Sequence, residues 1–173
     1  LAAMRPALRE RIGRDLFMRV GLNTGHAIVG NMGSRSRFNY TMIGDAVNLS
    51  SRLEGVNKEF GTYTMVSRDT REVLGSAFAA RELGRIAVVG RGEPVTVYEP
   101  MLPEEFEAKR KTFSVFAQGL ELFYSGKFRE ALDIFSALSD TDPPAAAYKK
   151  KCAALLNAPP QQAWSGVWVM TSK

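Results

Sequence analysis

The chain has 173 residues, of which 45% are hydrophobic and 24% charged, and it carries a net charge of +5 with a pI near 9.5. These values are ordinary for a globular protein, and the length allows one domain, or one domain with an appendage. The single cysteine, Cys152, excludes an internal disulfide framework and a multi-cysteine metal site. No apolar run reaches the ~18 residues that a membrane span needs. The clusters of basic residues at 109–111 and 149–151 fall on expected helices, where they indicate solvated faces, and we expect no nucleic-acid partner.

The first hundred residues predict alternating strands and helices. In chain order the expected elements are a helix over 3–14, strands over 17–22 and 26–30, a loop over 31–36, a strand over 38–43, a helix over 45–60, a strand over 63–66, a helix over 67–74, a long strand over 79–89, a turn over 90–94 and a strand over 95–98. The turn signal Asn23-Thr24-Gly25 predicts that the first two strands pair as a hairpin. Asp45 is a candidate N-cap or first-turn acid, and Ser67 a candidate cap of the next helix. This part is therefore expected to be an α+β domain.

Pro100 and Pro103 mark a boundary, after which the pattern becomes helical. We expect one domain over 1–100 and a small all-α tail over 101–173. Apolar residues at helical spacing predict two amphipathic helices, followed by a third over 145–156; those of the first two are Phe113, Phe116, Leu120, Phe123, Phe128, Ala131, Leu132 and Phe135. Trp164 and Trp168 stand in an extended segment that we expect to pack back on the protein.

The tail resembles a single tetratricopeptide repeat with a capping helix. The residues that carry this resemblance are Gly119, Gly126, Ala131, Phe135 and Pro143. Small residues at these places let two antiparallel helices approach closely. Two interpretations remain open for the tail, a structural cap and a groove that binds a protein partner.

The most informative segment runs from Arg37 to Glu54, where a strand leads through Gly44 into a helix. On that helix Asn48 and Arg52 are four residues apart and therefore share a face. An amide and a guanidinium placed in this way can hold a ribose oxygen and a phosphate oxygen, because the planar fork of arginine donates two parallel hydrogen bonds. The same spacing also occurs on any exposed polar helix face.

The sequence of this region resembles that of class III adenylyl cyclases of the bacterial multidomain type. The resemblance rests on Val-Gly-Leu-Asn-Thr-Gly-x-x-x-x-Gly-Asn-x-Gly over 20–33 and on Tyr-Thr-x-Ile-Gly-Asp-Ala-Val-Asn-Leu-Ser-Ser-Arg-Leu-Glu over 40–54. The stretch over 82–98 is similar to the final hairpin of that domain. The resemblance implies the C-terminal part of a ferredoxin-like cyclase domain, with an antiparallel sheet and helices. It also implies that the protein makes cyclic AMP from ATP. The glycines over 21–33 match neither a Walker motif nor a dinucleotide fingerprint, so we interpret them as turn residues.

Four residues receive roles from the resemblance. It implies that Asn48 orients the ribose, that Arg52 binds phosphate in the transition state, and that Thr41 occupies the base-recognition position. Where the family often has Lys-Gly-Lys, this chain has Val89-Gly90-Arg91, and Arg91 is the candidate substitute for the triphosphate contact. Threonine both donates and accepts hydrogen bonds, which is compatible with adenine.

The resemblance further implies Mg²⁺ or Mn²⁺ as cofactor, with ligands in an N-terminal half that the chain before Phe17 does not resemble. Because the chain starts at Leu1, we expect a piece of a longer protein. Because the metal-binding half is not present in it, we expect the chain to be inactive alone. The resemblance also implies that the chain lies in the cytoplasm and forms a homodimer through the cyclase part. Two other hypotheses are a noncatalytic cyclase-like dimerisation or regulatory module, and a helical-repeat interaction protein.

Overall fold

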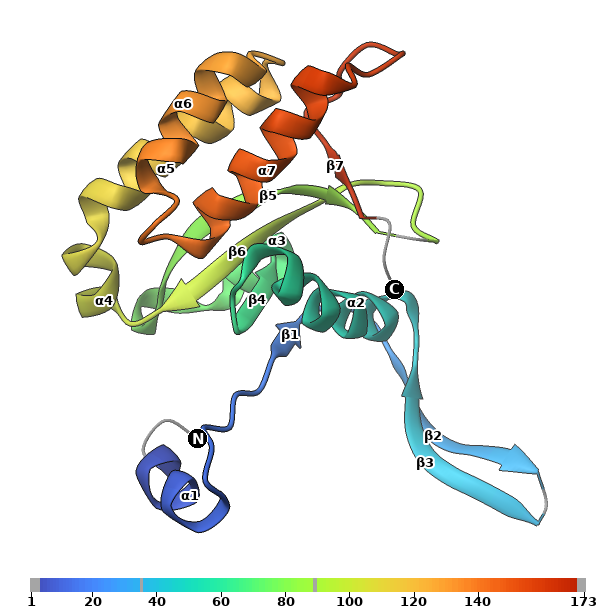
Figure 1. The fold of residues 1–173 in the computed structure, drawn as a ribbon. Helices are drawn as coiled ribbons and strands as arrows, with labels where there is room; N and C mark the ends of the chain where they lie inside the picture. The colour runs from blue at the N-terminus through green and yellow to red at the C-terminus, as the bar shows by residue number, and fades with distance from the viewer. Residues whose placement is uncertain (1–3, 35, 89, 171–173) are drawn as a thin grey trace.

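The computed structural model describes residues 4–34, 36–88 and 90–170 (Figure 1). Its helices are α1 (Arg5–Ile12), α2 (Asp45–Phe60), α3 (Arg68–Val73), α4 (Pro103–Ala108), α5 (Arg110–Tyr124), α6 (Phe128–Leu138) and α7 (Pro143–Asn157), with a 3-10 turn, η2 (Gly75–Ala77). Its strands are β1 (Val20–Leu22), β2 (Ile28–Ser34), β3 (Arg37–Ile43), β4 (Thr64–Ser67), β5 (Ala79–Ala87), β6 (Val95–Met101) and β7 (Trp168–Val169). None of the helices in these ranges is long and apolar enough to cross a membrane.

The main sheet has five strands in the order β1-β4-β6-β5-β7. The pairs β4–β6 and β5–β6 are antiparallel, as the sequence predicted for the final hairpin. The pairs β1–β4 and β5–β7 are parallel, so the sheet is mixed where an antiparallel one was predicted. The two parallel pairs join strands that are far apart in the chain, and local turn signals carry no information about such pairing.

The predicted hairpin between 17–22 and 26–30 was also wrong. β1 pairs with β4, whereas β2 pairs with β3 in a separate two-stranded sheet, with Ile28 opposite Ile43 and Ser34 opposite Arg37. The segment Asn31–Ser34, which we expected to be a loop, therefore belongs to a strand. Nearly every residue of this hairpin is exposed, and it projects away from the sheet (Figure 1). Because neither face of the hairpin is buried, Asn, Gly and Ser are tolerated there without the apolar alternation that marks a half-buried strand.

β1 lies unusually close to α2, and Gly21 makes this approach possible. A Cβ at Gly21 would collide with the backbone of Ser50 and Glu54. Ser50 Oγ donates to the Gly21 carbonyl oxygen at 2.7 Å, and the buried amide of Asn57 donates to the Val20 carbonyl oxygen at 3.0 Å. Gly21 is therefore a close-contact residue rather than the turn residue that we predicted, and these bonds fix the position of α2 along β1.

The ends of α2 follow from its sequence. Gly44 is the N-cap and Asp45 lies in the first turn, where a carboxylate is favoured by the positive end of the helix dipole. Gly61 ends the helix in the left-handed conformation at φ 68°. The predicted helix over 45–60 is thus confirmed, as is the Ser67 cap of α3, whose side chain accepts from Thr70 N.

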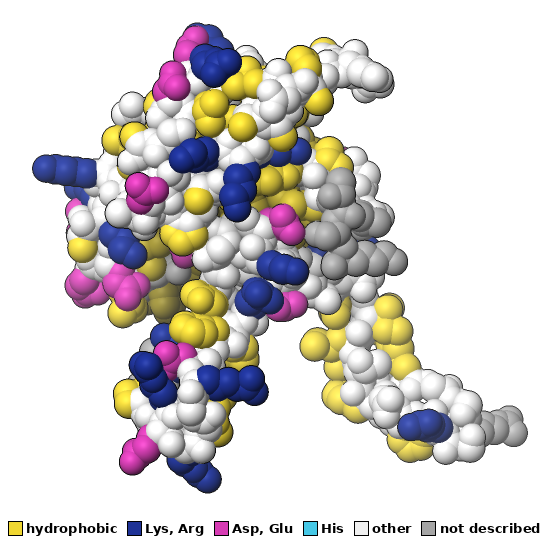
Figure 2. Space-filling model, in the orientation of Figure 1, with side chains coloured by type: hydrophobic (Ala, Val, Ile, Leu, Met, Phe, Trp, Pro, Cys, Tyr) yellow, Lys and Arg dark blue, Asp and Glu magenta, His cyan; other side chains and the backbone are white. Residues whose placement is uncertain are grey.

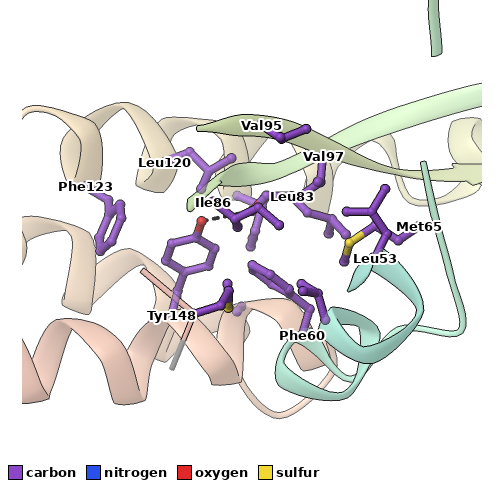
Figure 3. Close-up of a cluster of buried hydrophobic side chains, with 14 of the residues drawn as sticks. Leu53, Phe60, Met65, Leu83, Ile86, Val95, Val97, Leu120, Phe123 and Tyr148 are labelled. Atoms are coloured by element: carbon purple, nitrogen blue, oxygen red, sulfur yellow. Dashed lines mark hydrogen bonds between the residues drawn. The ribbon is translucent and has the colours of Figure 1, made fainter. Parts of the chain in front are cut away.

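One hydrophobic core joins the first hundred residues to the tail. Phe60 of α2 and Tyr148 of α7 lie 5.9 Å apart between their ring centroids, and both are fully buried. Figure 3 shows these two side chains approaching the strand residues Leu83 and Ile86 from the two helices. The Tyr148 hydroxyl donates to the Leu83 carbonyl oxygen at 2.9 Å. The tail therefore completes the core over the sheet.

Within the tail, α5 and α6 form a helical hairpin. A Cβ at Gly119 would lie 2.8 Å from the ring of Phe135, which confirms that a small residue is needed where these helices meet. Pro143 starts α7, and the short helix α4 was not predicted. The extended segment packs back as expected, since Trp168 pairs with Ile86 and Trp164 Nε1 donates to the Phe123 carbonyl oxygen. The likeness of the tail to a tetratricopeptide repeat stays a prediction.

Candidate active site

The candidate site is built on α2, which carries Asn48 and Arg52 one helical turn apart. Asn48 is exposed, and Arg52 is half-buried. The arrangement predicted from their spacing is therefore present on a helix that β1 fixes from behind.

The guanidinium of Arg52 lies beneath the turn between β5 and β6. A Cβ at Gly90 would stand 3.1 Å from Arg52 Nη2, and Gly90 adopts a left-handed φ of 77°. Arg52 Nη1 is inaccessible to solvent and finds no hydrogen-bond partner among the described residues. A desolvated donor without an acceptor is costly, and an anionic ligand would satisfy it.

Arg52 borders a pocket of about 560 Å³. Positive side chains on its wall are Arg19, Arg52 and Lys58, and acidic ones are Glu54 and Glu59. Val56, Val88 and Met170 supply apolar surface to the same pocket. A cavity with several cations and an apolar wall suits a ligand that combines phosphates with a nonpolar part.

Arg91 lies between β5, which ends at Ala87, and β6, which begins at Val95, within the stretch where the sequence predicted a turn. Its Nη1 stands 3.5 Å from Asp45 Oδ2 at the start of α2, and it lines another pocket, of about 230 Å³, with Arg68 and Arg85. The structure therefore brings Arg91 to the first turn of α2 rather than to the Arg52 pocket. Val89, at the place of the expected lysine, lies outside the described residues.

Thr41 stands on β3, opposite Gly30, and is exposed. It lies on the projecting hairpin and does not line the Arg52 pocket. Met170, in contrast, lines that pocket although it is remote in sequence, and no pattern around it signals a role.

Divalent metal ions are used by class III cyclases in general, so we tested whether the residues fit a metal. Within residues 4–34, 36–88 and 90–170, no group of three or more His, Cys, Asp or Glu side chains is arranged to hold one. The residues of this chain that the structure describes do not fit a metal site, and we derive no step through one.

Residues 1–99 match the model of the adenylate and guanylate cyclase catalytic domain family. The chain belongs to this family. Among curated relatives of this cyclase-family chain, the terminal-differentiation specific adenylate cyclase of Dictyostelium discoideum is 33% identical over 143 residues, which cover 77% of the chain. Adenylate cyclase 1 of Rhizobium meliloti is 40% identical over 99 residues, which cover 57% of the chain. The matches span only 7% and 15% of these relatives' own lengths.

A solved structure gives a similar result for the cyclase fold. The crystal structure of the adenylyl cyclase CyaB from P. aeruginosa matches with a TM-score of 0.50 and 33% identity. The match covers 58% of this chain and 50% of that chain. The α+β fold of this chain, a sheet with helices, is thus similar to that of a cyclase domain.

Proposed function

We propose that this chain supplies the substrate-orienting part of an adenylate cyclase, which converts ATP to 3′,5′-cyclic AMP and diphosphate. The observation that carries the proposal is the Arg52 guanidinium, whose buried Nη1 has no acceptor among the described residues, one helical turn from exposed Asn48. The two relatives described above are both named adenylate cyclases, which supports the choice of reaction.

The chemistry assigns separate tasks to the two side chains. In the cyclisation the ribose 3′ oxygen attacks the α-phosphorus, and an O3′–P bond forms while the bond to the diphosphate oxygen breaks. The 3′-hydroxyl proton passes to a water molecule, and diphosphate leaves with the electron pair of that bond. Arg52 is suited to hold the phosphoryl oxygens as their charge develops, and Asn48 to hold the ribose so that attack is in line.

Adenine is the base that we propose, with Thr41 in contact with it. Because Thr41 lies on the hairpin and outside the Arg52 pocket, this contact requires a base bound along the hairpin or supplied across a subunit boundary. We further propose that Mg²⁺ or Mn²⁺ ligands come from residues beyond those described, that the chain alone is inactive, and that it works in the cytoplasm.

The partner that we propose is a second cyclase domain of the same kind. The β2–β3 hairpin supports this proposal, because it exposes apolar side chains on a projecting arm; those exposed by half or more are Ile28, Val29, Phe38, Tyr40, Met42 and Ile43. Figure 2 shows hydrophobic side chains along this arm. Exposed apolar surface of this extent typically marks an interface.

The test mixes this chain with a complete class III adenylate cyclase domain whose own asparagine and arginine at the corresponding positions are both replaced by alanine. Cyclic AMP from ATP and cyclic GMP from GTP are measured with Mg²⁺ and with Mn²⁺, for each protein alone and for the mixture. We expect cyclic AMP only in the mixture. Arg52→Ala should lower it by roughly 10²–10³-fold, as when a donor to a developing oxyanion is removed.

A matched control is Arg129→Ala, which removes an exposed arginine from α6, away from the pocket, and should leave the rate unchanged. Circular dichroism establishes that each variant is folded. A folded chain that yields no product in the mixture would contradict the proposal and favour a noncatalytic dimerisation module.

A further inference from the structure

The C-terminal segment reaches the candidate site by adding a strand to β5. Trp168 pairs with Ile86 and Val169 with Ala87, and Met170 N then donates to the Ala87 carbonyl oxygen at 2.9 Å. This is the last part of β5 before the turn that holds Gly90. The segment therefore braces the backbone that leads into the turn above Arg52.

The same segment is anchored to α2. The Trp168 ring lies 5.2 Å from the Phe60 ring at the end of that helix and 5.0 Å from the Tyr148 ring of α7. The ammonium of Lys151 lies over the Trp168 ring, 5.4 Å from its centre. Because these contacts fix β7 against both α2 and β5, Met170 has a defined place between them.

Met170 forms part of the wall of the pocket that Arg52 also lines. Only 5% of its surface is exposed, and it lines the Arg52 pocket together with Val88, which is equally buried. Arg52 Nη1 has no hydrogen bond among the described residues, and Gly90 lies so close to the guanidinium that an added Cβ would stand 3.1 Å from Nη2. Hydrogen bonds to the described part of the protein therefore do not hold Nη1.

We propose that Met170 is a positioning residue for Arg52, through which the tail sets the affinity of the candidate site for the phosphates of ATP. This inference rests on the proposed function for its consequence, but the positioning itself is a property of the ligand-free chain. Arginine has many rotamers, and a donor held in place before the ligand arrives loses less freedom on binding. Without the Met170 side chain, Arg52 gains space and water, and the site loses this preorganisation.

The experiment follows the Arg52 guanidinium by NMR in the chain without nucleotide. The Nε–Hε signal of Arg52 is assigned by its loss in Arg52→Ala, and its exchange with water is measured. We expect exchange to quicken roughly tenfold in Met170→Ala, as the donor becomes solvated. Met170→Leu, which conserves the volume, should restore slow exchange. Val169→Ala is the matched control, since that side chain on the same strand is 58% exposed.

The functional readout is the mixed cyclase assay described above. Met170→Ala should raise the KM for ATP roughly tenfold, and more than it changes kcat, but should add no further loss when Arg52 is already alanine. If Met170→Ala does not fold, Met170→Val gives the same comparison with a smaller change in volume.

An unchanged Arg52 signal in folded Met170→Ala would overturn the inference, whatever the assay shows. An altered signal together with an Arg52→Ala variant that retains full activity would support the positioning and overturn the proposed function. The two failures are therefore distinguishable.

Discussion

Tyr148 of α7 donates a 2.9 Å hydrogen bond to the carbonyl oxygen of Leu83 in β5, and both residues are fully buried. This bond joins the helical tail to the first strand of the final hairpin at a register shift between Glu82 and Gly84. Burial and the nearby Glu82 carboxylate raise the pKa of Tyr148 well above its ordinary value, so the hydroxyl keeps its proton. At the register shift in β5, the Leu83 carbonyl oxygen thus accepts a hydrogen bond from the Tyr148 hydroxyl of the tail.

Tyr148→Phe should destabilise the chain by about 1–2 kcal/mol, because the Leu83 carbonyl oxygen loses the donor that satisfies it in the core. Urea unfolding followed by circular dichroism measures the effect. Tyr40→Phe removes an exposed hydroxyl and is the matched control. Equal stability of the two variants would mean that water replaces the buried bond.

Arg81 is the second link between the sheet and the tail. Its guanidinium contacts Glu99 at 2.7 Å and Asp142 at 2.8 Å, and lies 4.4 Å from the centre of the Phe113 ring. Arg81→Met should cost about 3 kcal/mol, since the Asp142 carboxylate then remains buried without a cation.

Arg110→Met is the control for Arg81, because it breaks only an exposed pair with Glu107 and should change the urea midpoint very little. Both variants are measured by the same unfolding experiment. A similar midpoint for the two would contradict the structural role of Arg81.

Cys152 should resist alkylation while the chain is folded. Burial raises the pKa of its thiol from the ordinary 9.0 to about 12. At pH 8.5 the folded thiol is therefore almost fully protonated and enclosed, and iodoacetamide should react only after unfolding in urea. Rapid alkylation of the folded chain would contradict this.

The same shift makes stability depend on pH. Because the folded state holds the proton more tightly, the contribution of Cys152 is complete below pH 9 and is lost as the pH rises from 9 to about 12. Cys152→Ala should remove that part of the decline, although Tyr148 and Tyr124, whose pKa values burial also raises, add to the alkaline loss. Urea midpoints across this range measure the difference.

The exposed apolar side chains of the β2–β3 hairpin predict that two copies of the chain associate through it. Phe38 and Tyr40 on β3 are 62% and 75% exposed, so the double change to serine should leave helical content unchanged while weakening association of two copies. Sedimentation velocity over a range of concentrations measures the mass. Val73→Ser, at a 67% exposed position of α3, is the control. A variant that associates as strongly as the unaltered chain would exclude the hairpin as the interface.

The sequence predicted most elements well where the signal was local. α2, the Ser67 cap and the final hairpin each depend on patterns within a few residues, and each was confirmed. The prediction of the strand that pairs with β1 was wrong. The backbone groups of Val20 and Leu22 pair with a strand about forty residues further on, which no turn signal reveals.

The sequence likewise predicted one part of the candidate site and gave no signal for the other. The spacing of Asn48 and Arg52 follows from helix geometry, and the structure places both on α2 as expected. The approach of Gly90 to Arg52, the pairing of Arg91 with Asp45 and the presence of Met170 in the pocket all depend on tertiary packing. Such contacts join distant parts of the chain, so the sequence alone gives no signal for them.

The edge position of β7 has a consequence for the order of folding. Trp168 meets Ile86 only after the whole helical tail has returned to the sheet, so this pairing closes a very long loop. Contacts of such high contact order form late. Until they form, β5 exposes an unpaired edge beside β6, a surface that invites pairing with other chains. Among the strands that the structure describes in this sheet, β7 is therefore the one that covers the β5 edge and keeps it from pairing with other chains.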